Sequence, residues 1–206
     1  MLSSLLEIFF SGKSRLRKEL SEAREELAPL SKDLVKWEKD ELELLSLIQT
    51  KRKSKSAFSS SVEGIICSIY HEYMVSYIWK KIPINNIHII VAQSANYKFD
   101  MVIKNELCSF YVNDQYLGDF KNDNKLYLSK KRILATLEES DAEWWAIKVE
   151  NEFIGSLINI EKARRVSPRT FQLRRNLSEI DEAVILSIAI YKIIEKTRKM
   201  KKIPFE

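Results

Sequence analysis

Residues 177–199 read LSEIDEAVILSIAIYKIIEKTRK, and this stretch decides the fold class. Ser178 suits a helix N-cap and Asp181 follows three residues later, which predicts a helix over residues 179–199. Between Ala183 and Tyr191 there is no charged side chain, so this helix has almost no polar face. Its apolar part, about 18 Å long at 1.5 Å per residue, is too short to span a bilayer and too apolar for a surface. We therefore expect a helix buried inside the β-structure that precedes it.

The segment before this helix changes from a period of 3.6 residues to a period of two, which indicates β-strands. Turn residues such as Asn113-Asp114 and Asn122-Asp123-Asn124 separate the runs. Many short strands at this spacing predict an antiparallel meander that closes into a barrel or a sandwich. The nine expected strands cover residues 87–93, 97–103, 107–113, 116–120, 125–129, 132–138, 144–150, 153–159 and 170–175.

One internal repeat strengthens the prediction of a meander. The segment YVNDQYLGDF (111–120) aligns with KVENEFIGSL (148–157), position by position. Both carry valine, two turn residues, an aromatic residue, an aliphatic residue and glycine in the same order. The same hairpin is expected twice, with Gly118 and Gly155 where a strand bends or where another backbone comes close.

Residues 1–50 predict a helical extension. From Leu16 to Ile48 the apolar positions alternate in steps of four and three, which is a heptad seam that Glu41 interrupts once. Pro29 either kinks this helix or separates two helices. A coiled coil that binds a second copy or a partner helix through residues 16–48, and a helical hairpin within the chain, both stay open.

A basic, serine-rich stretch at residues 51–61 is expected to link the extension to the domain. Residues 62–81 show apolar positions at helical spacing before Pro83, which predicts a helix, although their β-branched and aromatic content leaves a strand open. The expected fold is α+β. It consists of a helical or coiled-coil extension, then a domain over residues 62–206. In this domain a barrel-like antiparallel meander of about nine strands is followed by the buried apolar C-terminal helix.

A β-meander followed by one apolar helix resembles the tubby C-terminal-like superfamily, which includes tubby domains, phospholipid scramblases and the LURP-one-related proteins. The resemblance covers about residues 87–195 and depends on the two repeated hairpins, the SPRTFQL strand (167–173) and EAVILSIAIYKII (182–194). It implies a closed barrel around a central helix. Since tubby domains bind phosphoinositides, it also implies an association with lipid. No lipid-binding motif of that family matches particular residues of this chain.

Sequence motifs for catalysis are absent. The two histidines, His71 and His88, do not form an HExxH motif, and there is no GxGxxG, P-loop or GxSxG. The two cysteines, Cys67 and Cys108, have neither zinc-site nor disulfide spacing. We expect a protein that is not an enzyme, has no metal or cofactor, and keeps its thiols reduced in the cytoplasm.

Positive charge gathers in the last part of the chain, where residues 162–206 carry 12 basic and 5 acidic side chains, an excess of +7. No acid interrupts the stretch from Lys162 to Leu177. Arginine suits phosphate, so a patch here is predicted to bind a lipid headgroup, another phosphate-bearing ligand or a nucleic-acid backbone. A solvated basic loop is the plainer alternative. The predicted phosphate- or lipid-binding residues are Lys162, Arg164, Arg165, Arg169, Arg174 and Arg175.

The N-terminal segment is a second candidate for membrane contact. Leu2, Leu5, Leu6 and Phe9 fall on one helical face, and basic residues follow from Lys13 onward. This face either lies in a membrane interface or packs on the chain's own core or on a second copy. These observations favour a non-enzymatic adaptor at an anionic membrane surface, located in the cytoplasm and peripheral to the inner face of the membrane. A nucleic-acid-associated protein that uses the same arginines, and a scaffold that acts through its coiled coil, are the alternatives.

Overall fold

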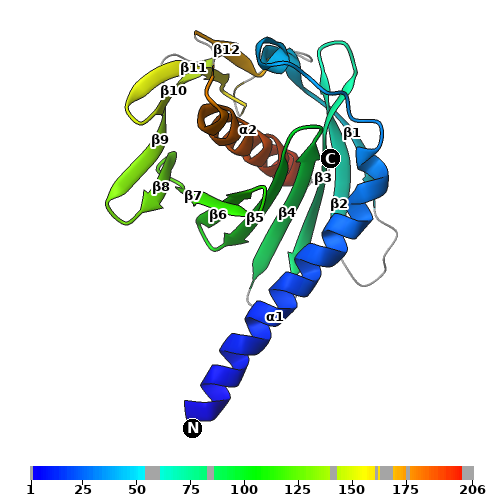
Figure 1. Ribbon diagram of the computed structural model, residues 1–206, viewed down its shortest axis with the longest axis vertical. Coiled ribbons are helices and arrows are strands. Elements are labelled where there is room, and N and C mark those ends of the chain that lie inside the picture. The colour runs from blue at the N-terminus through cyan, green and yellow to red at the C-terminus, as the bar shows by residue number, and fades with distance from the viewer. Residues whose placement is uncertain are drawn as a thin grey trace.

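The computed structural model describes residues 2–53, 61–82, 86–139, 143–160, 162, 169–174 and 177–200 (Figure 1). The helices are α1 (Leu2–Leu27), the short 3-10 helices η1 (Ala28–Ser31) and η2 (Lys39–Leu44), and α2 (Glu179–Met200). The strands are β1 (Leu45–Lys53), β2 (Ser61–Ser68), β3 (Tyr73–Ile82), β4 (Ile87–Ser94), β5 (Lys98–Lys104), β6 (Leu107–Val112), β7 (Gln115–Lys121), β8 (Lys125–Ser129), β9 (Arg132–Glu139), β10 (Trp144–Val149), β11 (Glu152–Ile158) and β12 (Phe171–Leu173).

The strands form one antiparallel sheet of twelve strands in sequence order, so each strand pairs with the next one along the chain. The sheet curls round α2 (Figure 1) and is not closed. At one corner its two ends meet: Ser46 forms an isolated bridge with Arg169, and the Thr170 N–H donates to the Leu45 carbonyl at 2.8 Å. The barrel-like meander is therefore confirmed in outline. The prediction of about nine strands is wrong, because three more precede them.

All three additional strands lie where the sequence predicted helix or linker. For residues 62–81 the strand alternative is the correct one, since they form β2, a short connection and β3 rather than a helix. Residues 45–53 form β1 rather than the end of a coiled coil. The reason is burial on both faces of the sheet. Residues Met74 to Ile78 of β3 are buried in succession, so the alternation that marks a strand is lost. Of the predicted linker, residues 51–53 belong to β1, and residues 54–60 lie outside the described part.

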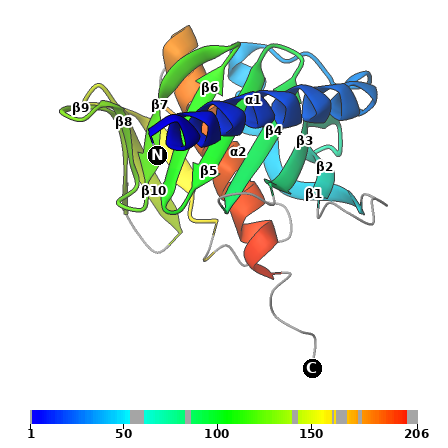
Figure 2. The same cartoon turned by 90° about the horizontal axis from the view of Figure 1, so that it is seen from below.

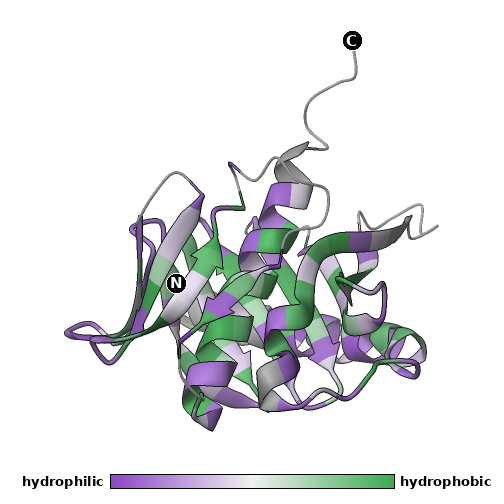
Figure 3. Ribbon diagram, turned by 90° about the horizontal axis from the view of Figure 1, so that it is seen from above, coloured by the Kyte–Doolittle hydropathy of each residue, from purple (hydrophilic) through white to green (hydrophobic). Residues whose placement is uncertain are grey.

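Helix α2 fills the inside of the curled sheet, as predicted. Val184, Ile185, Leu186, Ile188 and Ile190 are each 0% exposed, and they join the main core cluster with the inner faces of the strands. Figure 3 shows hydrophobic residues along the strands and in α2, with hydrophilic residues at the hairpin turns. Burying each such side chain contributes about 1.5–3 kcal/mol, so α2 is a central stabilising element.

The predicted N-cap of this helix is also confirmed. The Ser178 Oγ accepts a hydrogen bond from the Asp181 N–H at 3.2 Å, and Asp181 Oδ2 accepts one from the Ser178 N–H at 3.1 Å. This reciprocal arrangement satisfies two backbone donors at the start of α2.

Helix α1 lies on the opposite side of the sheet from α2 and crosses the outer face of β3, β4 and β5 (Figure 2). A second apolar cluster joins α1 to β3 and β4. It contains Ala23, Leu27, Ile78, Ile82, Ile89 and Val91, with Leu16, Leu20, Leu30 and Ile87 packed against it. The seam over residues 16–30 thus contacts the chain's own sheet.

The heptad seam does not continue as one helix to residue 48, so that prediction is wrong. Helix α1 ends at Leu27, two residues before Pro29, and η1 follows with Pro29 in its first turn. The chain then continues through η2 into β1, so Pro29 neither kinks a longer helix nor joins two α-helices. Proline explains the stop, since it lacks a backbone donor and disfavours helix at the residue before it.

The sequence repeat is a structural repeat in detail. In β6–β7 the turn residues Asn113 and Asp114 have φ of 49° and 64°, and Glu150 and Asn151 in β10–β11 have 50° and 69°. Positive φ at both central residues is the geometry of a type I′ hairpin turn. Each hairpin also has a register shift beside its repeated glycine, between Phe110 and Tyr111 in the first hairpin and between Ile147 and Lys148 in the second.

Both repeated glycines are required by their surroundings, as predicted. Gly118 and Gly155 have φ of 153° and 156°, which L side chains rarely adopt. A Cβ at Gly118 would lie 2.8 Å from the Tyr127 carbonyl oxygen, and one at Gly155 would lie 2.5 Å from the Gln172 carbonyl oxygen. The neighbouring strand therefore approaches the hairpin closely at the bulge.

Candidate functional site

The predicted arginine patch is described only in part, since Arg164, Arg165 and Arg175 lie outside the described residues. Its three described members contact separate elements. Lys162 pairs with Glu139 at the end of β9. Arg169 lies 3.6 Å from Glu43 in η2, and the guanidinium of Arg174 lies 5.2 Å from the ring centroid of Phe153. All three side chains are exposed, so these contacts cost little to exchange for a ligand.

Helix α1 is fastened to the sheet by ion pairs as well as by apolar packing. The guanidinium of Arg24 pairs with Asp100 of β5 and with Asp114 in the β6–β7 turn. The hydrogen bond to Asp100 is the main cause that raises the pKa of Arg24, and Asp114 adds to it against the opposing effect of burial. Because one guanidinium pairs with carboxylates on two separate elements, it fixes the position of the helix along the strands.

A second ion-pair group lies further towards the N-terminus of α1. Lys80 of β3 is buried, and its Nζ lies 2.8 Å from Glu19 and 3.7 Å from Glu22. Burial alone would lower the pKa of Lys80, but the hydrogen bond and charge of Glu19, with the charges of Glu26 and Glu22, raise it overall. The glutamates of α1 therefore stabilise the charged form of Lys80, and these ion pairs in turn attach α1 to β3.

The N-terminal turns of α1 extend past the strands of the sheet (Figure 1). The predicted membrane-contact residues Leu2, Leu5, Leu6 and Phe9 all fall in these turns. Their side chains lie outside the described part of the structure. Arg15 and Lys18, which follow, have side chains that are 47% and 76% exposed, and each lies within 4 Å of a glutamate one turn later. Over the described residues, neither α-helix combines the length and the hydropathy that crossing a bilayer requires.

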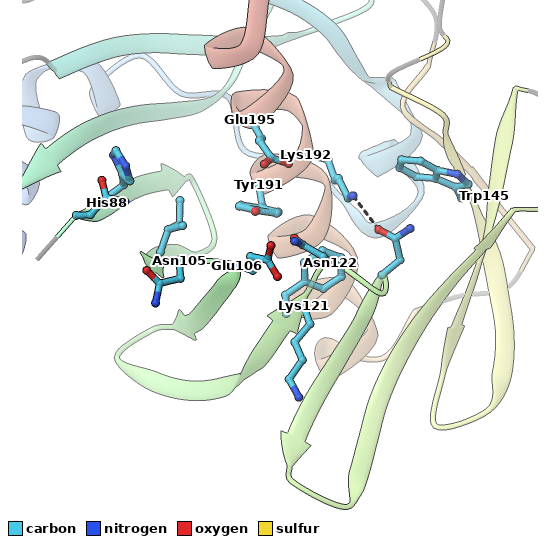
Figure 4. A pocket seen from close by; sticks show the side chains of 13 residues that line it. His88, Asn105, Glu106, Lys121, Asn122, Trp145, Tyr191, Lys192 and Glu195 are labelled. Atoms are coloured by element: carbon cyan, nitrogen blue, oxygen red, sulfur yellow. Dashed lines mark hydrogen bonds between the residues drawn. The ribbon is translucent and has the colours of Figure 1, made fainter.

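A cavity of about 530 Å³ opens beside the C-terminal half of α2, at one end of the curled sheet (Figure 4). Four asparagines from three turns contribute to its lining: Asn86 before β4, Asn105 between β5 and β6, and Asn122 and Asn124 between β7 and β8. Asn86, Asn105 and Asn124 have φ between 50° and 59°, a conformation that asparagine tolerates better than most residues. The curl of the sheet brings these turns together.

The apolar part of the lining is rigid and aromatic. Phe120 of β7, Trp145 of β10 and Tyr191 of α2 are at most 8% exposed, and Ile103 completes the set. The rings of Phe120 and Tyr191 meet edge to face with centroids 5.7 Å apart. Edge-to-face packing is a favoured arrangement of aromatic rings, so it helps to hold these two side chains in place.

The charged residues of the lining are Glu106, Lys121, Lys192 and Glu195, together with His88. The Nζ of Lys192 donates to Asn124 Oδ1 at 2.8 Å and lies 4.9 Å from the ring centroid of Trp145, so its position is fixed (Figure 4). The Nζ of Lys121 lies 4.2 Å from the ring centroid of Tyr127, and in Figure 4 this side chain points away from Tyr191. The His88 ring stacks on Trp79 with centroids 5.1 Å apart.

A buried thiol lies close to one of these carboxylates. Cys108 is buried near Glu195 and Asp119, and burial, reinforced by these two carboxylates, raises the pKa of its thiol well above the ordinary value. A thiol held in this form is a poor nucleophile. Among the described residues, no three His, Cys, Asp or Glu side chains gather closely enough to hold a metal ion.

Sequence reasoning missed this cavity. Asn122 and Asn124 are predicted as turn residues and Tyr191 as part of the buried helix, but the sequence does not indicate that they meet. The signal that was available is an accumulation of asparagines in alternate turns of a meander, since alternate turns lie at the same end of the sheet. Comparison with protein-family models, curated proteins and solved structures finds no match to this chain.

Proposed function

We propose that the protein is a non-enzymatic adaptor that docks on anionic membrane surfaces through the N-terminal half of α1. The observation that carries this proposal is the attachment of α1. Residues 16–27 are fastened to the sheet by an apolar cluster and by the ion pairs of Arg24 and Lys80, while the turns before them extend past the sheet. The helix is thus a fixed arm rather than a free tail.

The sequence of the arm suits an anionic surface. Positions 2, 9, 16 and 23 are spaced by seven residues, so a continuous helix carries them along one face, and this face packs on the sheet at positions 16 and 23. Each large apolar side chain that enters a membrane interface contributes up to about 1.5–3 kcal/mol. Lys13, Arg15, Arg17 and Lys18 add about 1 kcal/mol each near anionic lipid. Together these terms suffice for reversible binding.

Two further features support the proposal. The apolar helix inside a curled antiparallel sheet is similar to the closed barrel around a helix that the resemblance to the tubby-like superfamily implies, although this sheet is not closed, and that superfamily has lipid associations. The arginine-rich segment 162–175 provides a second basic surface that can contact the same headgroups. Its described cations, Lys162, Arg169 and Arg174, are exposed, and each contacts one side chain among the described residues, so they are available to phosphate.

The test is co-sedimentation of the full chain with phosphatidylcholine vesicles and with vesicles that also contain phosphatidylserine, at low and high salt. We expect binding only to the anionic vesicles, weakened by salt because exposed charges are screened. The double variant Leu5→Glu/Phe9→Glu should lose it, and the matched variant Arg164→Gln/Arg165→Gln should keep most of it. Loss in the arginine variant alone would move the docking surface to residues 162–175. Absence of binding by the unmodified chain would reject the membrane function.

A further inference from the structure

We propose that the cavity beside the C-terminal half of α2 binds a small, uncharged, hydroxyl-rich molecule, of the size of a monosaccharide or a disaccharide. The volume of about 530 Å³ falls within the usual range for small-molecule sites, roughly 300–1,000 Å³. The lining combines buried aromatic rings with amide side chains, which gives a ligand both an apolar wall and directional hydrogen bonds. This inference is independent of membrane docking, which uses the other side of the sheet.

The asparagines point to hydroxyl groups. A side-chain amide offers two donors and one acceptor oxygen, and a hydroxyl both donates and accepts, so the two match without any charge. For Asn86, Asn105 and Asn124 the left-handed backbone by itself accounts for the residue type. Asn122 is outside that group and still faces the cavity, so backbone conformation does not account for all four. Three separate turns bring these amides to one space.

The charges of the lining point to an uncharged ligand. Glu106 and Glu195 offset Lys192, and the Lys121 ammonium lies over the Tyr127 ring, so an anion such as phosphate gains no net attraction. The ammonium of Lys192 is held between the Trp145 ring, the Phe120 ring and Asn124 Oδ1. Held in this way, it serves as an oriented donor rather than as a mobile counter-ion.

The aromatic residues add only a small apolar surface to the cavity. Phe120 and Trp145 are 3% and 6% exposed, and the Lys192 ammonium lies over both rings. Their exposed parts, together with Ile103, give the C–H groups of a sugar a limited apolar contact. The hydrogen bonds of the turn asparagines and Lys192 therefore carry most of the recognition.

The experiment is a titration of the isotopically labelled full chain, followed by amide chemical shifts. The probes are glucose, galactose, N-acetylglucosamine and maltose, with inorganic phosphate and glycine as the anionic and zwitterionic comparisons. The variants are Lys192→Met, which keeps the aliphatic stem, and Asn122→Ala, which changes an exposed turn residue. Lys98→Met is the matched control, because Lys98 is an exposed lysine at the opposite end of β5 from Ile103 and Asn105.

We expect at least one sugar to give saturable shifts that gather at the cavity residues and are insensitive to salt. Lys192→Met and Asn122→Ala should each weaken the affinity about tenfold, as expected for the loss of one well-placed hydrogen bond, and Lys98→Met should not. The proposal is overturned if none of the sugars shifts the cavity resonances. It is equally overturned if phosphate or glycine binds there in place of sugar, or if sugar binding is the same in both cavity variants as in the unmodified chain.

Discussion

Replacing Leu186 by alanine tests whether α2 is the centre of the fold. Leu186 is 0% exposed in the middle of α2, whereas Ile180 in the first turn of the same helix is 46% exposed. Leu186→Ala removes three carbons, and at about 0.8 kcal/mol each their transfer from the core to water costs about 2.4 kcal/mol. The space left behind adds to this, which gives a total of about 2–5 kcal/mol. Ile180→Ala should change the free energy of unfolding by less than about 0.5 kcal/mol.

The assay is urea unfolding of both variants, followed by tryptophan fluorescence, with thermal melts as a second measurement. For a chain of this size each kcal/mol lowers Tm by about 2–4 °C, so Leu186→Ala should melt roughly 4–20 °C lower than the unmodified protein. Equal, small effects at the two positions would mean that α2 is not enclosed by the sheet. That result would refute the reasoning that an apolar helix of this length must be internal.

Three further predictions concern the repeat, the helix interior and pH. Gly155→Ala should lower the free energy of unfolding by about 1–3 kcal/mol through backbone strain, while Ser156→Ala beside it should change it by less than about 0.5 kcal/mol. If urea unfolding gives similar values for the two variants, the close approach of the neighbouring strand is not the reason for glycine at position 155. Ser187→Ala should be nearly neutral in the same assay, because its hydroxyl donates to the Ala183 carbonyl of its own helix at 2.7 Å, and a loss above about 2 kcal/mol would contradict this. Stability should be lower at pH 10.5 than at pH 7. Folding raises the pKa of Cys108 and of Lys80 above their ordinary values of 9.0 and 10.5, so the unfolded chain loses these protons first as the pH rises. Urea midpoints that stay level or rise with pH would contradict this prediction.

Much of the β-domain is predictable because its local signals agree with its tertiary structure. The hairpins at 111–120 and 148–157 are marked by turn residues and by glycine, and the structure matches them down to the bulge. Beyond Ile87 all nine predicted strands are present, with ends within two residues of the predicted ones. In strands such as β6 and β10 one face is buried and the other is only partly covered, so the alternation survives in the sequence; β4, which α1 covers, is recognised by its β-branched residues and flanking turns.

The first three strands could not be predicted in the same way. β3 has α2 on its inner face and α1 on its outer face, so apolar residues occupy both faces and their spacing imitates a helix. The apparent heptad continued past Leu27 because residues of several different elements fit the spacing, from Leu30 in η1 to Leu44 at the end of η2 and Ile48 in β1. An apolar periodicity that continues across a proline arises here from different secondary-structure elements, and only the tertiary contacts distinguish them.

The candidate sites differ in what the sequence could reveal. A run of basic residues is visible in one segment, and so Lys162 to Arg175 could be named, although Lys162, Arg169 and Arg174 contact different elements. The cavity is assembled from residues between 86 and 195, which no local pattern connects. Its discovery needs the curl of the sheet, a property of the whole chain.

The central functional claim is that α1 docks on anionic lipid while the sheet holds it. Amide hydrogen exchange of the full chain, with and without vesicles that contain phosphatidylserine, tests it most directly. The account predicts slower exchange in peptides from residues 2–18 when the anionic vesicles are added, and no change with neutral vesicles. Unchanged exchange in those peptides, with protection confined to residues 162–175 or found nowhere, would contradict it.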